Sequence, residues 1–176
     1  MSFEFLEGSI GRTVQLERGG PDKVVGALEG MGRDYLVLRT EQHGVLYCVM
    51  HHIKTVSEPV TPVIKSEREE DERDYYSEIP VIEAETFHDL LKRMKHCLIQ
   101  VNHGGPNAIK GVLMKVGHDS ITLVHDMKEF VHYPLYHIRS VSRIYEIEGQ
   151  NDKGNNKDDD KGENKSGRGK DKKESR

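Results

Sequence analysis

The sequence contains no tryptophan, only two cysteines among its 176 residues and no excess of positive charge. No apolar run approaches the roughly 20 residues that a membrane-spanning helix needs. The acidic start, Met1–Glu7, has no hydrophobic segment of the kind that a secretory signal carries. These absences predict a protein that is made and kept inside the cell. The net charge of −4 gives no reason to expect a nucleic-acid-binding protein.

The two cysteines, Cys48 and Cys97, lie far apart in the sequence and in no metal-binding spacing. We expect them to be free thiols in a reducing cytosol. The alternative is an intermolecular disulfide in an oxidised, assembled structure.

Catalytic motifs are also missing, since the sequence has neither a Gly-x-Ser-x-Gly elbow nor a phosphate-binding loop between a strand and a helix. Ten histidines raise the question of metal binding. No cysteine or carboxylate accompanies them at the fixed spacings of zinc sites. His51 and His52 are expected on opposite faces of a strand, and His132 and His137 meet only if their two strands fold together. We therefore predict no metal, no cofactor and no enzyme activity.

The most informative feature that is present is an internal repeat. A shift of 85 residues aligns 11–57 with 96–142 without a gap, and thirteen positions are identical. An ungapped match with glycines in register indicates two copies of one structural unit. The glycines and prolines that mark the repeat are Gly19, Gly20, Pro21 and Gly26 in the first copy and Gly104, Gly105, Pro106 and Gly111 in the second.

Each copy is predicted to contain five short strands, because apolar and polar residues alternate between turn residues. The Gly-Gly-Pro motif makes the first turn, since proline presets φ for the first central position and Asp or Asn suits the next. Gly26 indicates a bulge or sharp bend in the second strand. The predicted strands are 13–17, 24–30, 35–39, 45–50 and 52–56 in the first copy, and 97–102, 108–116, 120–125, 129–133 and 137–141 in the second.

A short amphipathic helix is predicted over 84–94, with Thr86 as its N-cap, and residues 3–6 form a weaker counterpart before the first copy. A helix followed by five bent strands resembles the Sm-like barrel, and an SH3-like barrel is the alternative. The predicted fold class is therefore mainly β, with two tandem small five-stranded barrels, each preceded by a short helix.

Charge patterning divides the chain into four parts. The first barrel spans 1–58 and the helix with the second barrel spans 84–148. Between them, 59–83 is an acidic linker that should repel itself and stay extended. Residues 149–176 contain no aliphatic or aromatic side chain, so this charged tail is expected to be disordered.

The stretches Arg18–Asp22 and His103–Gly111 resemble the repeats of the spore coat protein B family of Bacillus-type spore formers, and the strand endings Tyr47–Ser57 and Tyr133–Ser142 are similar too. The resemblance implies a structural protein of the outer spore layers, made in the mother cell and deposited on the forespore. Its implied partners are other spore coat proteins and further copies of itself. The best-known member of the family has a long Ser/Lys-rich tail that a kinase phosphorylates, whereas the tail here holds only two serines.

An RNA-binding Sm-like ring is the alternative function. The repeated histidines His52 and His137, followed two residues later by Lys54 and Arg139, would lie near the pore of such a ring. These four are the candidate rim or contact residues. A simpler interpretation is that each histidine orients the last strand by a hydrogen bond. The acidic linker and the negative net charge weigh against RNA, because backbone binding requires a clustered basic surface.

Overall fold

A computed structural model of the chain describes residues 3–59 and 79–145, which belong to one compact unit. The predicted tail, 149–176, and most of the predicted linker, 59–83, lie outside the described residues. Within the described part, no helix is long and apolar enough to cross a membrane.

The described residues are mainly β, as predicted, with four short helices beside ten strands. The helices are the 3-10 helices η1 (Glu4–Ser9), η2 (Met50–His52) and η4 (Leu135–His137) and the α-helix α1 (Phe87–Arg93). The strands of the first copy are β1 (Thr13–Leu16), β2 (Val24–Met31), β3 (Tyr35–Thr40), β4 (Gly44–Val49) and β5 (Val56–Ser57). Those of the second are β6 (Leu98–Val101), β7 (Ile109–Val116), β8 (Ser120–His125), β9 (Glu129–Pro134) and β10 (Ser140–Arg143).

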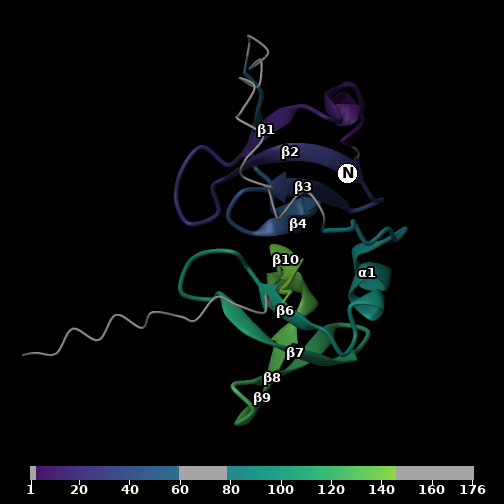
Figure 1. Cartoon of the computed structure of the whole chain (residues 1–176), viewed down its shortest axis with the longest axis vertical. Coiled ribbons are helices and arrows are strands. Elements are labelled where there is room, and N and C mark those ends of the chain that lie inside the picture. Colours follow the sequence, from purple (N-terminus) through teal and green to yellow (C-terminus); the bar gives the residue numbers. More distant parts are fainter. Residues whose placement is uncertain (1–2, 60–78, 146–176) are drawn as a thin grey trace, which may run out of the picture. The chain divides into compact units, whose positions relative to one another are not determined.

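All ten strands join one antiparallel sheet in the order β5-β1-β2-β3-β4-β10-β6-β7-β8-β9 (Figure 1). Each copy therefore has the same internal order, with its fifth strand beside its first. The fourth strand of the first copy, β4, pairs with β10 of the second copy. The described strand pairs thus form one open sheet, and the expected closure into two separate barrels is not confirmed.

The two copies pair their strands in the same register. Thr13 faces Ala27 in the first copy, and Leu98 faces Val112, each 85 residues later, in the second. Even the irregularities repeat, since β2 shifts register between Leu28 and Gly30, and β7 shifts at the equivalent place. The sequence repeat is therefore a repeat of backbone structure.

The Gly-Gly-Pro turns have the predicted geometry. Gly20 and Gly105 adopt φ values of +79° and +82°, a left-handed conformation that glycine reaches without steric cost. The backbone N–H of Lys23 donates to the carbonyl of Gly20 at 3.2 Å, and Ala108 donates to Gly105 at the same distance. Proline therefore occupies the first central position of each turn.

The bulge expected at Gly26 lies instead between Leu28 and Gly30. Gly26 has another role, because a Cβ there would lie 2.5 Å from the carbonyl oxygen of Arg39 on β3. Gly111 is in the equivalent position, 2.7 Å from the carbonyl oxygen of Val124. Both glycines allow two neighbouring strands to approach closely.

Helix α1 is shorter than the predicted 84–94, but Thr86 is its N-cap as predicted. The hydroxyl of Thr86 accepts a hydrogen bond from the backbone N–H of Asp89 at 3.1 Å, which satisfies one of the free donors at the helix start. The predicted apolar face is buried, with Leu90, Leu91 and Met94 all at 0% exposure.

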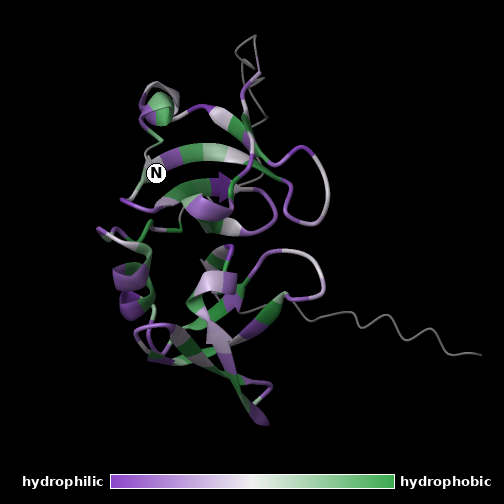
Figure 2. Cartoon of the chain, turned by 180° about the vertical axis from the view of Figure 1, so that it is seen from behind, coloured by the Kyte–Doolittle hydropathy of each residue, from purple (hydrophilic) through white to green (hydrophobic). Residues whose placement is uncertain are grey.

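Hydrophobic residues concentrate in the strands, while the connecting loops are mostly hydrophilic (Figure 2). They form two cores. The first contains side chains of the first copy alone, including Leu6, Leu28, Leu38 and Leu46. The second combines α1 and strands β6 to β8 and β10 with five residues of the first copy, namely Tyr35, Val37, Val45, Tyr47 and Val49.

Candidate functional site: the junction between the two copies

Strand β4 forms the centre of the junction. Tyr47 lies opposite Val141 of β10, and the backbone N–H of Val49 donates to the carbonyl of Arg139 at 2.8 Å. Every residue of β4 is buried. Its alternate side chains enter the two different cores, so one face of the strand packs in the core of its own copy and the other in the core shared with the second copy. A continuous apolar run is typical of strands covered on both sides.

Two tyrosines of the first copy attach the segment before α1. The Tyr47 hydroxyl accepts a hydrogen bond from the backbone N–H of Ile82 at 2.6 Å, and the Tyr35 hydroxyl donates to the carbonyl of Ala84 at 2.7 Å. Burial raises the pKa of Tyr47 to about 12, so its phenol stays protonated and neutral in this core.

The two Gly-Gly-Pro loops contact each other. A Cβ at Gly104 would overlap the carbonyl oxygen of Pro21, so only glycine fits there. Beside this contact, Asp22 of the first copy forms an ion pair with Arg139 of the second. The two side chains are 32% and 49% exposed, and exposed pairs of this kind contribute about 1 kcal/mol or less.

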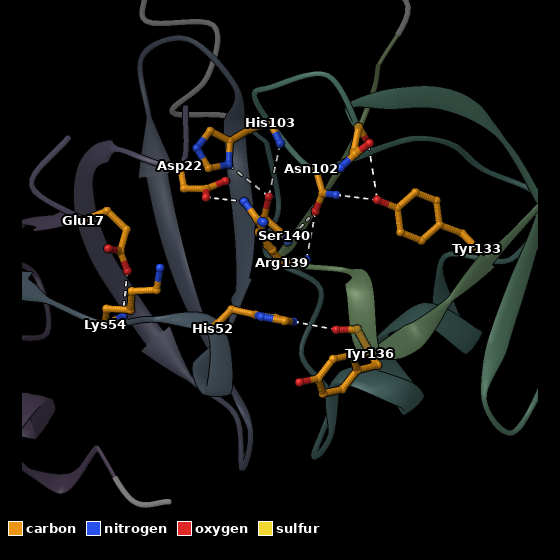
Figure 3. Close-up of polar contacts among 11 residues, drawn as sticks. Glu17, Asp22, His52, Lys54, Asn102, His103, Tyr133, Tyr136, Arg139 and Ser140 are labelled. Atoms are coloured by element: carbon orange, nitrogen blue, oxygen red, sulfur yellow. Dashed lines mark hydrogen bonds and ion pairs between the residues drawn. The ribbon is translucent and has the colours of Figure 1, made fainter. Parts of the chain in front are cut away.

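Figure 3 shows the polar contacts that hold the start of β10. Asn102 accepts a hydrogen bond from the backbone N–H of Arg139 at 2.8 Å and donates to the Tyr133 hydroxyl at 2.7 Å. In the first copy Glu17 does the same for the backbone N–H of Lys54, at 2.6 Å. Glu17 and Asn102 share a φ of +56°. This pair was not predicted, because the two residues differ in type, although both lie two positions before a Gly-Gly-Pro motif.

His103 lies at the contact between the loops. Its Nδ1 is 3.0 Å from the hydroxyl of Ser140, and its ring centroid is 5.5 Å from that of His43. Its buried Nε2 makes no hydrogen bond within the described residues. Burial lowers the pKa of His103, while the Asp22 carboxylate opposes that shift. Burial also lowers the pKa of His43, and the neighbouring His103 lowers it further.

These shifts predict a loss of stability in mild acid. A histidine whose pKa is lower in the folded state binds protons more readily when unfolded, so the free energy of unfolding falls as pH decreases from the ordinary value near 6.5. We expect chemical denaturation midpoints to be constant above about pH 7 and to fall between about pH 6.5 and 5. His103→Gln should flatten this dependence, whereas His118→Gln, an exposed histidine, should leave it unchanged. An unaltered slope in His103→Gln would contradict the assignment.

The candidate rim residues are only partly brought together. His52 crosses the junction, with its Nε2 at 2.8 Å from the carbonyl oxygen of Tyr136 (Figure 3). His52, Lys54 and Arg139 line a pocket of about 180 Å³ at the junction, whose other walls include Asp22, Cys48 and His103. His137 is exposed and does not line this pocket. Its ring lies against Tyr136, with centroids 5.4 Å apart.

The expectation that His51 and His52 point to opposite faces of a strand is wrong. Residues 50–52 form the 3-10 helix η2, and the two ring centroids are 3.9 Å apart. Burial lowers the pKa of His52, and His51 adds to this effect. Despite this pairing, no group of three or more His, Cys, Asp or Glu residues in the described ranges could hold a metal ion.

Both cysteines are free within the described structure. Cys48 is buried, and burial raises its pKa to about 12. Since the thiolate is the reactive form, burial disfavours reaction of the Cys48 thiol in the folded chain. Cys97 is half-buried.

The fold and the junction define a duplicated, mainly β protein whose two copies share a core and one sheet. No family model matches the chain. It is, however, 34% identical over 133 residues to spore coat protein B of Bacillus subtilis (strain 168). The match confirms the resemblance inferred from the Gly-Gly-Pro repeats, and it places the chain in a spore coat protein B-like family. It covers 76% of this chain but only 33% of that relative.

Proposed function

We propose that this chain is a structural component of the spore coat that acts by protein–protein assembly, without catalysis. The observation that carries the proposal is its similarity to spore coat protein B over 76% of its length. The shared core supports it, since side chains of one copy of this unit are buried in the core of the other. Other coat proteins are its proposed partners, and the mother-cell cytoplasm is its proposed place of synthesis.

Nothing in the described residues favours the RNA-binding alternative. Of the two repeated cations, Arg139 is paired with Asp22, and Lys54 lies beside Glu17 in the same pocket. Acidic side chains therefore accompany both cations, whereas a backbone-binding surface requires clustered, available positive charge.

The proposal is tested by following a fluorescent fusion of the full chain in sporulating cells of its native host. We expect the signal to appear in the mother cell and to form a shell on the forespore. Fluorescent protein expressed alone from the same promoter is the control. Coat extracts from a deletion strain should lack at least one further coat protein. A fusion that stays diffuse, together with an unchanged coat in the deletion strain, would overturn the proposal.

A further inference from the structure

We infer that one partner of this chain is a second copy of itself, bound by repeating between chains the junction that β4 and β10 form within the chain. This inference rests on the proposed assembly function and specifies its contact surface. The ten-stranded sheet ends at β5 on one side and at β9 on the other.

Among the described strands these two pair on one side only, and they are the repeat equivalents of the two junction strands. Strand β9 (129–134) lies 85 residues after β4 (44–49), and β5 (56–57) corresponds to part of β10 (140–143). Because the copies pair their strands in the same register, β9 presents the outer edge that β4 presents to β10. In the same way, β5 presents the edge that β10 presents to β4.

The internal register can therefore be transferred to a pair of chains. Leu46 faces Ser142 across the junction, and the equivalent residues are Val131 of one chain and Ser57 of the next. Tyr47 faces Val141, which corresponds to His132 facing Val56 of the next chain. This register is specific, because a slip of one residue moves every side chain to the other face.

Two exposed aromatic residues lie on the surfaces that this arrangement would cover. Phe130 is 68% exposed, whereas Val45, its equivalent at the internal junction, is 4% exposed. On the opposite surface Phe5 is 67% exposed, whereas its equivalent Leu90 is fully buried.

Leu90 lies in the core that the two copies share, whereas the core beside Phe5 contains only side chains of the first copy. The adjacent pair, Leu6 and Leu91, is completely buried in both copies, because each of these side chains enters the core of its own copy. Helix α1 lies beside the first copy, since the ring centroids of Phe87 and Tyr35 are 6.2 Å apart. A chain docked at β9 would supply Phe5 to an open hollow of about 620 Å³ that is lined by Met114, Thr122, Phe130 and His132.

The contact between chains would be weaker than the internal one. Pro134 replaces Val49 and has no N–H, so the equivalent of the 2.8 Å bond from Val49 to Arg139 is absent. Ser120, Thr122 and His132 replace the buried Tyr35, Val37 and Tyr47. Less apolar surface is then buried, so the association should be reversible and dependent on concentration.

The contact is also heterologous, because the β9 end of one chain meets the β5 end of another. Such contacts produce open chains or closed rings rather than two-fold dimers. This property distinguishes the inference from simple dimerisation.

Engineered disulfides test the register in the full chain. Val131→Cys and Ser57→Cys chains, purified separately and mixed under mild oxidation, should form a reducible cross-linked dimer, because residues in such non-hydrogen-bonded pairs are close. His132→Cys mixed with Ser57→Cys is the register control and should cross-link at least tenfold less. Wild-type protein, treated in the same way, measures the cross-linking that arises from the natural Cys97. Equal cross-linking of Val131→Cys chains alone would indicate a two-fold contact and overturn the inference.

Sedimentation of the full chain between 1 and 500 μM, roughly the range for weak contacts, provides the second test. Wild-type protein should form larger species as its concentration rises. Phe130→Asp or Phe5→Asp should raise the concentration at which these species appear at least tenfold. Met127→Asp is the matched control. Met127 is 84% exposed, and its equivalent in the first copy, Gln42, is exposed as well.

The outcomes separate this inference from the proposed function. A chain that reaches the forespore coat but neither cross-links nor self-associates leaves the coat function intact and overturns the contact between copies. A chain that associates as described but stays diffuse in sporulating cells supports the contact and overturns the coat function. Wild-type and Asp variants that sediment alike would also overturn the contact.

Discussion

Replacing Tyr47 with alanine should lower the free energy of unfolding by about 3–5 kcal/mol, the range for truncating a large buried aromatic residue. Tyr47 is 1% exposed and contributes to the second core although it belongs to the first copy. The truncation leaves a cavity between β4 and the second copy. It also removes the acceptor for the backbone N–H of Ile82, and a buried donor without a partner is costly. Denaturant titration followed by circular dichroism measures the loss.

The repeat supplies the control for this variant. His132 has the equivalent position in β9 but is exposed, so His132→Ala should change the free energy of unfolding by less than about 0.5 kcal/mol. Tyr47→Phe keeps the ring and loses only the hydroxyl, so it should cost about 1–3 kcal/mol. Similar losses in Tyr47→Ala and His132→Ala would show that β4 is not covered as described.

Gly104→Ala should destabilise the chain by about 1–3 kcal/mol, the usual cost of forcing an extra carbon into a filled space. The new methyl group would overlap the carbonyl oxygen of Pro21. That oxygen belongs to the backbone of the other Gly-Gly-Pro loop, so it cannot move aside by a change of side-chain rotamer. The loops must separate, which also disturbs the ion pair between Asp22 and Arg139.

Gly19→Ala is the matched variant, because Gly19 and Gly104 have the same position in the two copies. Nothing lies within 4 Å of a Cβ at Gly19. Without a clash, exchanging glycine for alanine restricts the unfolded chain and stabilises by about 0.4–1 kcal/mol. The two substitutions should thus have opposite signs in thermal unfolding. A loss of stability in both would contradict the described contact between the loops.

The local structure of this chain could be predicted because it depends on neighbouring residues. Pro21 sets its own φ, so the turn and its copy at Pro106 follow directly from the sequence. Thr86 caps α1 because its hydroxyl is three residues from the free N–H of Asp89. The ungapped repeat correctly indicated two structurally equivalent copies, since insertions or deletions would have broken the common register.

The junction could not be predicted, because the residue pattern of a strand does not determine which other strand it pairs with. The apolar run of β4 is compatible with a closed barrel or with a second copy across the sheet. Nothing near Tyr47 in the sequence indicates that it faces Val141. The contact of Gly104 with Pro21 is hidden for the same reason, since the shared Gly-Gly-Pro motif gives no sign that one loop contacts the other.

The shared second core has a consequence for how the chain unfolds. Five side chains of the first copy lie in the core of the second, so neither copy can lose its structure without exposing apolar surface of the other. Such coupling makes opening of one half cost nearly as much as opening of both, and the described residues should melt in a single cooperative transition. The sequence encodes the same structural unit twice, but the described residues should unfold as one domain.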